Sequence, residues 1–356
     1  MENKIYLCKI GKSSELLEKM IMKFTEKFQE VVYIDNTYTG SYKNKKILFA
    51  VQLEAMGVNL EMEPFINRIY NSASENQLQD SIGAILIHAK EEMYTKTKSS
   101  MLVFRLNYMG MRFPGRPMVE APDGLRNYIT PQKRNGESLE ENCYMETLDL
   151  ATRFSEYKTA DYKKAKPKIL TVHASEEGSN TLYLWKLVKK YLDKDDQIKE
   201  IYIPNGDVKD CEGCSYTVCK HFAKQKSCYY GGIMVEEVYP AILEADILIL
   251  LCPNYNDAIT ANLSAMINRL TAIFRHKKFH DKKLYSIIVS GSSGTEAIAT
   301  QLIRALNMNK TFQLPPQFII SAIANDKGSI KEIEDIEKRA EYFSLRINEE
   351  ENTAPN

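Results

Sequence analysis

The sequence predicts an α/β protein of two domains, the second of which is a doubly wound parallel sheet. A chain of 356 residues is longer than one ordinary hydrophobic core supports. Both halves alternate short apolar runs with helical patterns, which is the order of elements expected of α/β domains. A lysine-rich segment between 157 and 168, with a proline just before a strong strand, separates the halves. The domains are therefore placed at 1–160 and 161–356.

Short apolar runs in the first half predict four strands, and the helical spacing of apolar residues predicts three helices. The strands are expected at 5–10, 31–35, 45–53 and 82–89, and the helices near 14–29, 61–74 and 93–109. The stretch 111–135 is punctuated by proline and glycine and predicts a long structured loop. This half has an α/β pattern with less regular strand spacing than the second.

Five apolar runs in the second half are short and nearly continuous, as expected of strands buried on both faces of a parallel sheet. They lie at 168–174, 198–204, 245–253, 283–291 and 316–322. Helical patterns separate them, one of which puts Leu184, Val188 and Tyr191 on one face. A last helix is expected at about 329–347. This alternation predicts a doubly wound sheet of five parallel strands.

The composition argues against several functional classes. Forty-seven basic residues balance 47 acidic ones, so no global field favours nucleic acid or an anionic membrane surface. The longest apolar stretch, "ADILILLCP", is far shorter than a membrane span. The N-terminal "MENKIYLCKI" is too polar for a signal peptide, so a cytoplasmic protein is expected.

In a doubly wound sheet, ligands bind beyond the carboxyl ends of the strands. A loop of small, hydroxylated and turn-forming residues follows the first strand of the second half and leads into a helix. Its candidate binding residues are Ser175, Gly178, Ser179, Asn180 and Thr181. A phosphate there would meet backbone N–H groups, hydroxyls and the positive end of a helix dipole. The alternative is that Ser179 or Asn180 only caps the helix. The glycine fingerprints of nicotinamide Rossmann domains and P-loops are absent.

Two further polar loops follow the third and fourth strands of the second half. The third strand ends in a polar turn made of Pro253, Asn254, Tyr255, Asn256 and Asp257. A tyrosine ring beside backbone amides suits a flat heteroaromatic ligand, whereas an ordinary βα loop would leave the ring in solvent. The fourth strand ends in a small-residue loop made of Ser290, Gly291, Ser292, Ser293 and Gly294. A backbone of this kind can approach a ligand closely. Three such loops on one sheet edge predict a ligand site more specifically than any one of them.

These three loops resemble those of the flavodoxin-like NAD(P)H-dependent FMN reductases and the related iron–sulfur flavoproteins, over about 168–325. The resemblance implies a flavodoxin-like fold for the second domain and FMN as its cofactor. It implies that the first loop holds the FMN phosphate, that the second borders the isoalloxazine, and that the third contacts the pyrimidine end of the ring. The phosphate loop differs from the family pattern in carrying Glu176 and Glu177 where an arginine is common. The first half lacks such loops and is expected to be a degenerate flavodoxin-like partner domain without flavin.

The segment 210–228 holds four of the chain's seven cysteines within nineteen positions: Cys211, Cys214, Cys219 and Cys228. In a reducing compartment such a group is more often metal-binding or catalytic than a disulfide framework. Four thiolates suit a four-iron cluster or a structural zinc. The resemblance to iron–sulfur flavoproteins, which carry a compact cysteine run between the second and third strands, favours a [4Fe-4S] cluster over zinc. A loop of reduced thiols without metal is the alternative. The site is expected near the same sheet edge as the flavin loops.

The resemblance implies an FMN-dependent oxidoreductase that passes electrons from NAD(P)H or another donor to an acceptor, either a small molecule or a redox protein. The family pattern requires no catalytic acid or base, so no catalytic residue is named. The alternative is a non-catalytic electron-transfer or redox-sensing flavoprotein whose cysteine loop is a switch. A homo-oligomer is compatible with either function, and no partner among nucleic acids or membranes is expected.

Overall fold

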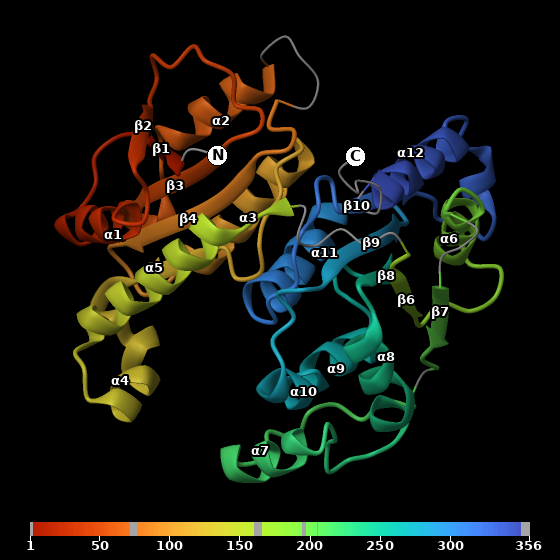
Figure 1. Cartoon of the computed structure of the whole chain (residues 1–356). Helices are drawn as coiled ribbons and strands as arrows, with labels where there is room; N and C mark the ends of the chain where they lie inside the picture. The colour runs from red at the N-terminus through yellow and green to blue at the C-terminus, as the bar shows by residue number, and fades with distance from the viewer. Residues whose placement is uncertain (1–2, 72–76, 160–165, 194–196, 205, 350–356) are drawn as a thin grey trace. The chain divides into compact units, whose positions relative to one another are not determined.

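A computed structural model describes residues 3–71, 77–159, 166–193, 197–204 and 206–349. The chain forms two compact units. The first consists of Met1–Tyr157 with Pro315–Gln317, and the second of Lys158–Leu314 with Phe318–Asn356. None of the described helices is long and apolar enough to cross a membrane. Each unit has its own sheet and helices (Figure 1).

The first domain is built on five parallel strands in the order β2-β1-β3-β4-β5. The strands are β1 (Lys4–Lys9), β2 (Glu30–Ile34), β3 (Lys46–Leu53), β4 (Ile82–Ala89) and β5 (Met118–Ala121). The helices longer than one turn are α1 (Glu15–Thr25), α2 (Met62–Asn71), α3 (Thr95–Tyr108), α4 (Ile129–Asn135) and α5 (Leu139–Glu156). Four strands and three helices therefore lie where the sequence predicts them.

The stretch 111–135 was expected to be a loop, and that expectation is wrong. It contains β5, a 3-10 helix over Asp123–Tyr128 and all of α4. The four residues of β5 are too few to show a periodic pattern, and proline and glycine flank them. The 18-residue helix α5 was also missed, although Cys143, Thr147, Leu150 and Phe154 are buried along it at helical spacing.

The second domain is built on five parallel strands in the order β10-β9-β8-β6-β7. They are β6 (Lys168–His173), β7 (Gln197–Tyr202), β8 (Ile247–Asn254), β9 (Lys283–Ser290) and β10 (Ile319–Ile323). In chain order this is the 2-1-3-4-5 arrangement of flavodoxin-like doubly wound sheets, so the predicted fold class is confirmed. The first domain has the same order.

Helices cover the second sheet, and most of them follow a strand. They are α6 (Asn180–Lys190), α7 (Tyr216–Lys224), α8 (Tyr239–Glu244), α9 (Ala261–Arg269), α10 (Thr271–His276), α11 (Thr295–Leu302) and α12 (Ile336–Glu349). Every residue of β9 is buried, because the sheet is covered on both faces. A hydrophobic core joins α6 and α12, which lie side by side in Figure 1, through Trp185 and Phe343 against the central strands.

Candidate functional site

The carboxyl ends of β8, β9 and β10 lie side by side. Asn254 at the end of β8 pairs with Ser290 at the end of β9, and Ser290 pairs with Ile323 at the end of β10. The strand order reverses between β6 and β8, so the loop after β6 emerges beside the loop after β8. The structure thus brings the three predicted loops together on one sheet edge.

The loop after β6 presents hydroxyls and free backbone donors at the start of α6. Ser175 is buried, and its Oγ has no hydrogen-bond partner within the described protein. Ser179 caps α6, since its Oγ accepts a hydrogen bond from the N–H of Leu182 at 3.2 Å. The remaining first-turn N–H groups of an α-helix have no partner inside the helix, so they are available to an anion.

Asn180 is used inside the protein and is not available to a ligand through its side chain. Its amide Nδ2 donates to the carbonyl oxygens of Ala324 at 3.1 Å and Asp326 at 2.8 Å. Its Oδ1 accepts from the N–H of Gly328 at 2.8 Å. The predicted phosphate contact of Asn180 is therefore limited to its backbone, and the side chain fastens the loop after β6 to the loop after β10.

The loop after β8 is a tight turn that leaves an aromatic ring in the open. Asn256 and Asp257 both have positive φ, 53° and 55°, and a β-bridge joins Tyr255 to Ala258 on either side of them. Two central residues with positive φ are typical of a type I′ turn, which favours asparagine and aspartate. The side chain of Tyr255 is 65% exposed, so its ring can cover one face of a flat ligand.

Asn254 joins the second loop to the third. Its Nδ2 lies 3.1 Å from Asp257 Oδ1, 3.1 Å from Ser290 Oγ and 2.9 Å from the carbonyl oxygen of Ser293. Its Oδ1 is buried and has no partner among the described residues, and the same holds for Oγ1 of Thr260 just before α9. Gly294 has a φ of 85°, and a Cβ added there would lie 1.8 Å from Asp257 Oδ1, so this contact requires glycine.

The unpaired polar atoms along this edge fit a bound polar cofactor. Buried polar groups almost always have hydrogen-bond partners, because an unpaired one loses its hydration without compensation. Ser175 Oγ, Asn254 Oδ1 and Thr260 Oγ1 are exceptions that lie in or just after the loops in question. Hydroxyl donors beside a helix N-terminus suit a phosphate, and an open tyrosine ring beside a polar turn suits a heteroaromatic ring. The residues present therefore fit FMN.

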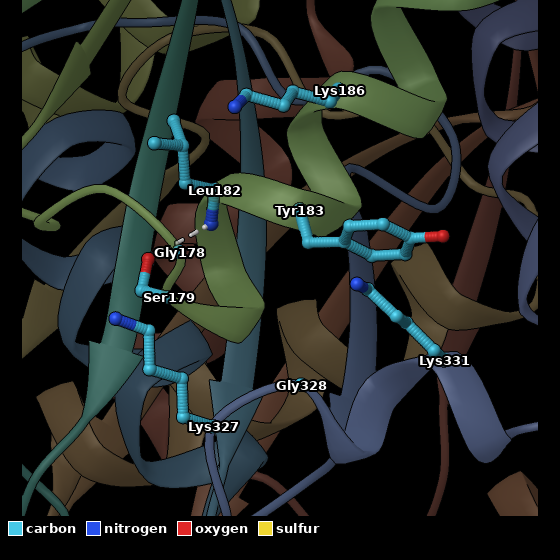
Figure 2. Close-up of a pocket in the computed structure, with 8 residues that line it drawn as sticks. All are labelled: Gly178, Ser179, Leu182, Tyr183, Lys186, Lys327, Gly328 and Lys331. Atoms are coloured by element: carbon cyan, nitrogen blue, oxygen red, sulfur yellow. Dashed lines mark hydrogen bonds between the residues drawn. The ribbon is translucent and has the colours of Figure 1, made fainter.

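The sequence predicted no role for two sets of residues at this edge. His173 ends β6, and its Nδ1 donates to the carbonyl oxygen of Ser175 at 3.1 Å. Burial lowers the pKa of His173 below its ordinary value. The second group lies in the loop after β10 and forms, with the start of α6, a pocket of about 250 Å³ rich in lysine (Figure 2). A histidine ending a strand and the run "NDKGSIK" after the last strand were the available signals.

The four cysteines of 210–228 line one cavity of about 100 Å³, here called the cysteine pocket. All four are free thiols, and Arg269 and Arg275 also line the cavity. Within the described residues, no group of three or more histidine, cysteine, aspartate or glutamate side chains is arranged to hold a metal ion. The thiols therefore fit a metal centre in number and chemistry but not in arrangement.

The position of the cysteine pocket differs from the expected one. Its walls include Arg269 at the carboxyl end of α9 and Thr271 of α10, against which α7 packs (Figure 1). The flavin loops lie at the other end of α9, which begins just after the loop of β8. A nine-residue helix is about 13 Å long, so the cysteine pocket is not on the sheet edge of the flavin loops.

Comparison with known proteins assigns the second domain. Residues 167–325 match the family model described as NADPH-dependent FMN reductase. This match shows that the second domain is similar to the NADPH-dependent FMN reductases. The match indicates an oxidoreductase and confirms the predicted resemblance to the FMN reductases, whereas the resemblance to the iron–sulfur flavoproteins stays a prediction. The match covers less than half of the chain, and no curated protein sequence matches.

Solved structures with a similar fold cover about half of the chain. RosB, solved with a bound 8-demethyl-8-formylriboflavin-5′-phosphate intermediate, has a TM-score of 0.41 and 14% identity over 52% of this chain and 78% of its own. An NAD(P)H:quinone oxidoreductase from Methanothermobacter marburgensis has a TM-score of 0.40 and 13% identity, and the match covers 52% of this chain and 98% of its own. Smu.1420 from Streptococcus mutans UA159 has a TM-score of 0.38 and 14% identity, and the match covers 50% of this chain and 99% of its own.

Proposed function

We propose that this chain binds one FMN at the carboxyl edge of its second sheet and uses it to pass electrons from NAD(P)H to an acceptor. The observation that carries the proposal is the set of buried, unpaired polar atoms in and beside three converging loops of a domain that matches the FMN reductase family. FMN supplies the hydride and electron chemistry when bound.

The chain's own residues bind and orient the cofactor in this proposal. The N–H groups at the start of α6, with the hydroxyls of Ser175 and Ser179, bind the phosphate. The ring of Tyr255 covers one face of the isoalloxazine, and the type I′ turn beside it presents backbone groups to the ring edge. No side chain is assigned as a proton donor or acceptor.

Ser175→Ala tests the flavin site with two readouts. Ser175 Oγ bonds to nothing within the described protein, so its loss leaves the stability of the flavin-free protein unchanged. A hydrogen bond to a charged phosphate is worth about 1.5–3 kcal/mol, so the FMN dissociation constant is expected to rise about 10- to 100-fold. Ser99→Ala is the matched control, because Ser99 of α3 is also buried with an unpaired Oγ.

Absorbance spectra and steady-state oxidation of NADH and NADPH with a quinone acceptor complete this test. The proposal predicts one FMN per chain and turnover with at least one nicotinamide donor. Unaltered FMN affinity in Ser175→Ala would contradict the assigned site. A chain that retains FMN but never turns over would instead support the electron-transfer or redox-sensing alternative.

The four thiols are not arranged around a metal in the described structure, and we propose further that the cysteine pocket closes around an iron–sulfur centre rather than zinc when one binds. Four thiols around one cavity support this assignment, and the guanidinium groups of Arg269 and Arg275 can offset the negative charge of thiolates. Iron, zinc and acid-labile sulfide should be measured in anaerobically purified protein and in Cys214→Ser. Cys252→Ser is the control, because Cys252 is buried in β8. Absence of both metals would leave the pocket as reduced thiols and favour the redox-switch alternative.

A further inference from the structure

A lysine-rich pocket lies beside the start of α6, outside the three loops that the sequence predicted. Its volume is about 250 Å³. It shares Gly178 and Ser179 with the phosphate loop, and the rest of its lining is Leu182, Tyr183, Lys186, Lys327, Gly328 and Lys331. Figure 2 shows Lys186 on α6 and Lys327 and Lys331 on the segment after β10, all three around this pocket. Two segments far apart in the sequence therefore supply three positive charges to one cavity.

None of these three lysines has an ion pair with a carboxylate in the described chain. Two neighbouring lysines of α6 do form ion pairs. The Nζ of Lys189 lies 2.5 Å from Glu200 Oε1, and the Nζ of Lys190 lies 2.6 Å from Glu337 Oε1. Lys331 contacts an aromatic face, with its Nζ 5.2 Å from the ring centroid of Tyr183. Like charges that form no ion pair repel one another, so this pocket is favourable for an anion from solution.

The position of Lys327 is built into the fold. Asn180 bonds to the carbonyl of Asp326 and the N–H of Gly328, the two residues on either side of it. Gly178 makes room for the lysine stem, since a Cβ at Gly178 would lie 2.6 Å from Lys327 Cε. Lys327 is thereby held against the phosphate loop, which itself carries the carboxyl groups of Glu176 and Glu177. The loop after β10 thus places positive charge at the carboxyl edge of the second sheet.

We propose that Lys186, Lys327 and Lys331 form a binding site for a phosphate monoester dianion. Three ammonium groups, the capping serine and the start of α6 match a doubly charged tetrahedral anion better than a single carboxylate. Two sources carry this group under the proposed function, on which this step rests: the 5′-phosphate of FMN and the 2′-phosphate of NADPH. The site itself does not depend on which of them occupies it.

The test is the double variant Lys327→Gln/Lys331→Gln of the full chain. Its matched control is Lys189→Gln/Lys190→Gln, which removes the same charge from lysines that already have carboxylate partners. Inorganic phosphate is the flavin-independent probe: it is expected to raise the melting temperature of the wild type and the control, and to raise that of the double variant much less. This readout remains valid if the protein binds no flavin, so it separates this proposal from the proposed function.

Comparison of FMN with riboflavin, and of NADPH with NADH, identifies the ligand whose phosphate occupies the site. If FMN occupies the site, its dissociation constant rises about tenfold in the double variant while that of riboflavin does not change. If NADPH occupies it, its KM rises about tenfold while that of NADH does not change. Equal responses of the double variant and the control to phosphate, FMN and NADPH would overturn the proposal.

Discussion

Replacing Asn180 by alanine separates a structural role from a direct phosphate contact. The side chain is 8% exposed and makes three hydrogen bonds, to the carbonyls of Ala324 and Asp326 and from the N–H of Gly328. Each such bond contributes about 0.5–1.5 kcal/mol net, so the free energy of unfolding is expected to fall by about 2–4 kcal/mol. The loss comes from the protein itself, because the partners left behind are backbone groups next to β10.

The assay is urea unfolding of flavin-free protein, followed by titration with FMN and with riboflavin. Asn127→Ala is a suitable control, because the exposed Asn127 makes one side-chain hydrogen bond, to the carbonyl of Glu120, and its loss should cost less than about 1 kcal/mol. A stability loss below about 1 kcal/mol in Asn180→Ala, with FMN binding weakened and riboflavin binding intact, would refute the reasoning. That result would mean that the amide leaves its carbonyl partners to bind the phosphate.

Three further predictions follow from single contacts. Gly294→Ala adds about 1–2 kcal/mol of strain from the left-handed backbone conformation and displaces Asp257, so titration with FMN should show weaker binding. The control is Gly136→Ala, because Gly136 has a similar φ and an added Cβ would meet nothing within 4 Å. This control should not weaken FMN binding. Because burial lowers the pKa of His173, the unfolded chain binds more protons below about pH 6.5. The free energy of unfolding should therefore decrease as the pH is lowered through this range. In the His173→Gln variant this decrease should be smaller. Burial raises the pKa of the Cys252 thiol to about 12, so iodoacetamide at pH 8 should label the cysteine pocket in metal-free folded protein and spare Cys252, as mass spectrometry can show.

The fold of the second domain could be predicted because its strands are local signals. Four of its five strands begin within two residues of the expected position, since each is a continuous apolar run. The last strand begins at Ile319 rather than 316, because Pro315 and Pro316 precede it and have no N–H for a ladder. In the first domain β5 was missed for the opposite reason, since its four residues carry too little pattern.

The site was predictable where it is local and not where it depends on packing. The three loops are each a few residues after a strand, so parallel topology alone brings them together. The amide of Asn180 bonds to a residue 146 positions away, and no sequence pattern marks that contact or the lysine it positions. The predicted position of the cysteine pocket was wrong for the same reason. The packing of α7 against α10 decides where the long connection between β7 and β8 lies.

The two sheets share one strand order, and their edges differ in which polar groups are already paired. Ser14 caps α1 as Ser179 caps α6, each accepting from an N–H three residues on at 3.2 Å. In the first domain, however, the N–H of Ser14 donates to Gln52 Oε1 at 3.0 Å, and its Oγ lies 3.1 Å from His88 Nδ1. In the second domain the N–H of Ser179 likewise donates to the carbonyl oxygen of Glu176 at 3.2 Å, but Ser175 Oγ has no partner among the described residues. A helix N-terminus binds an anion with donors that the protein has not used, so the unpaired hydroxyl of Ser175 supports the proposed flavin site in the second domain, and a first domain without flavin stays a prediction.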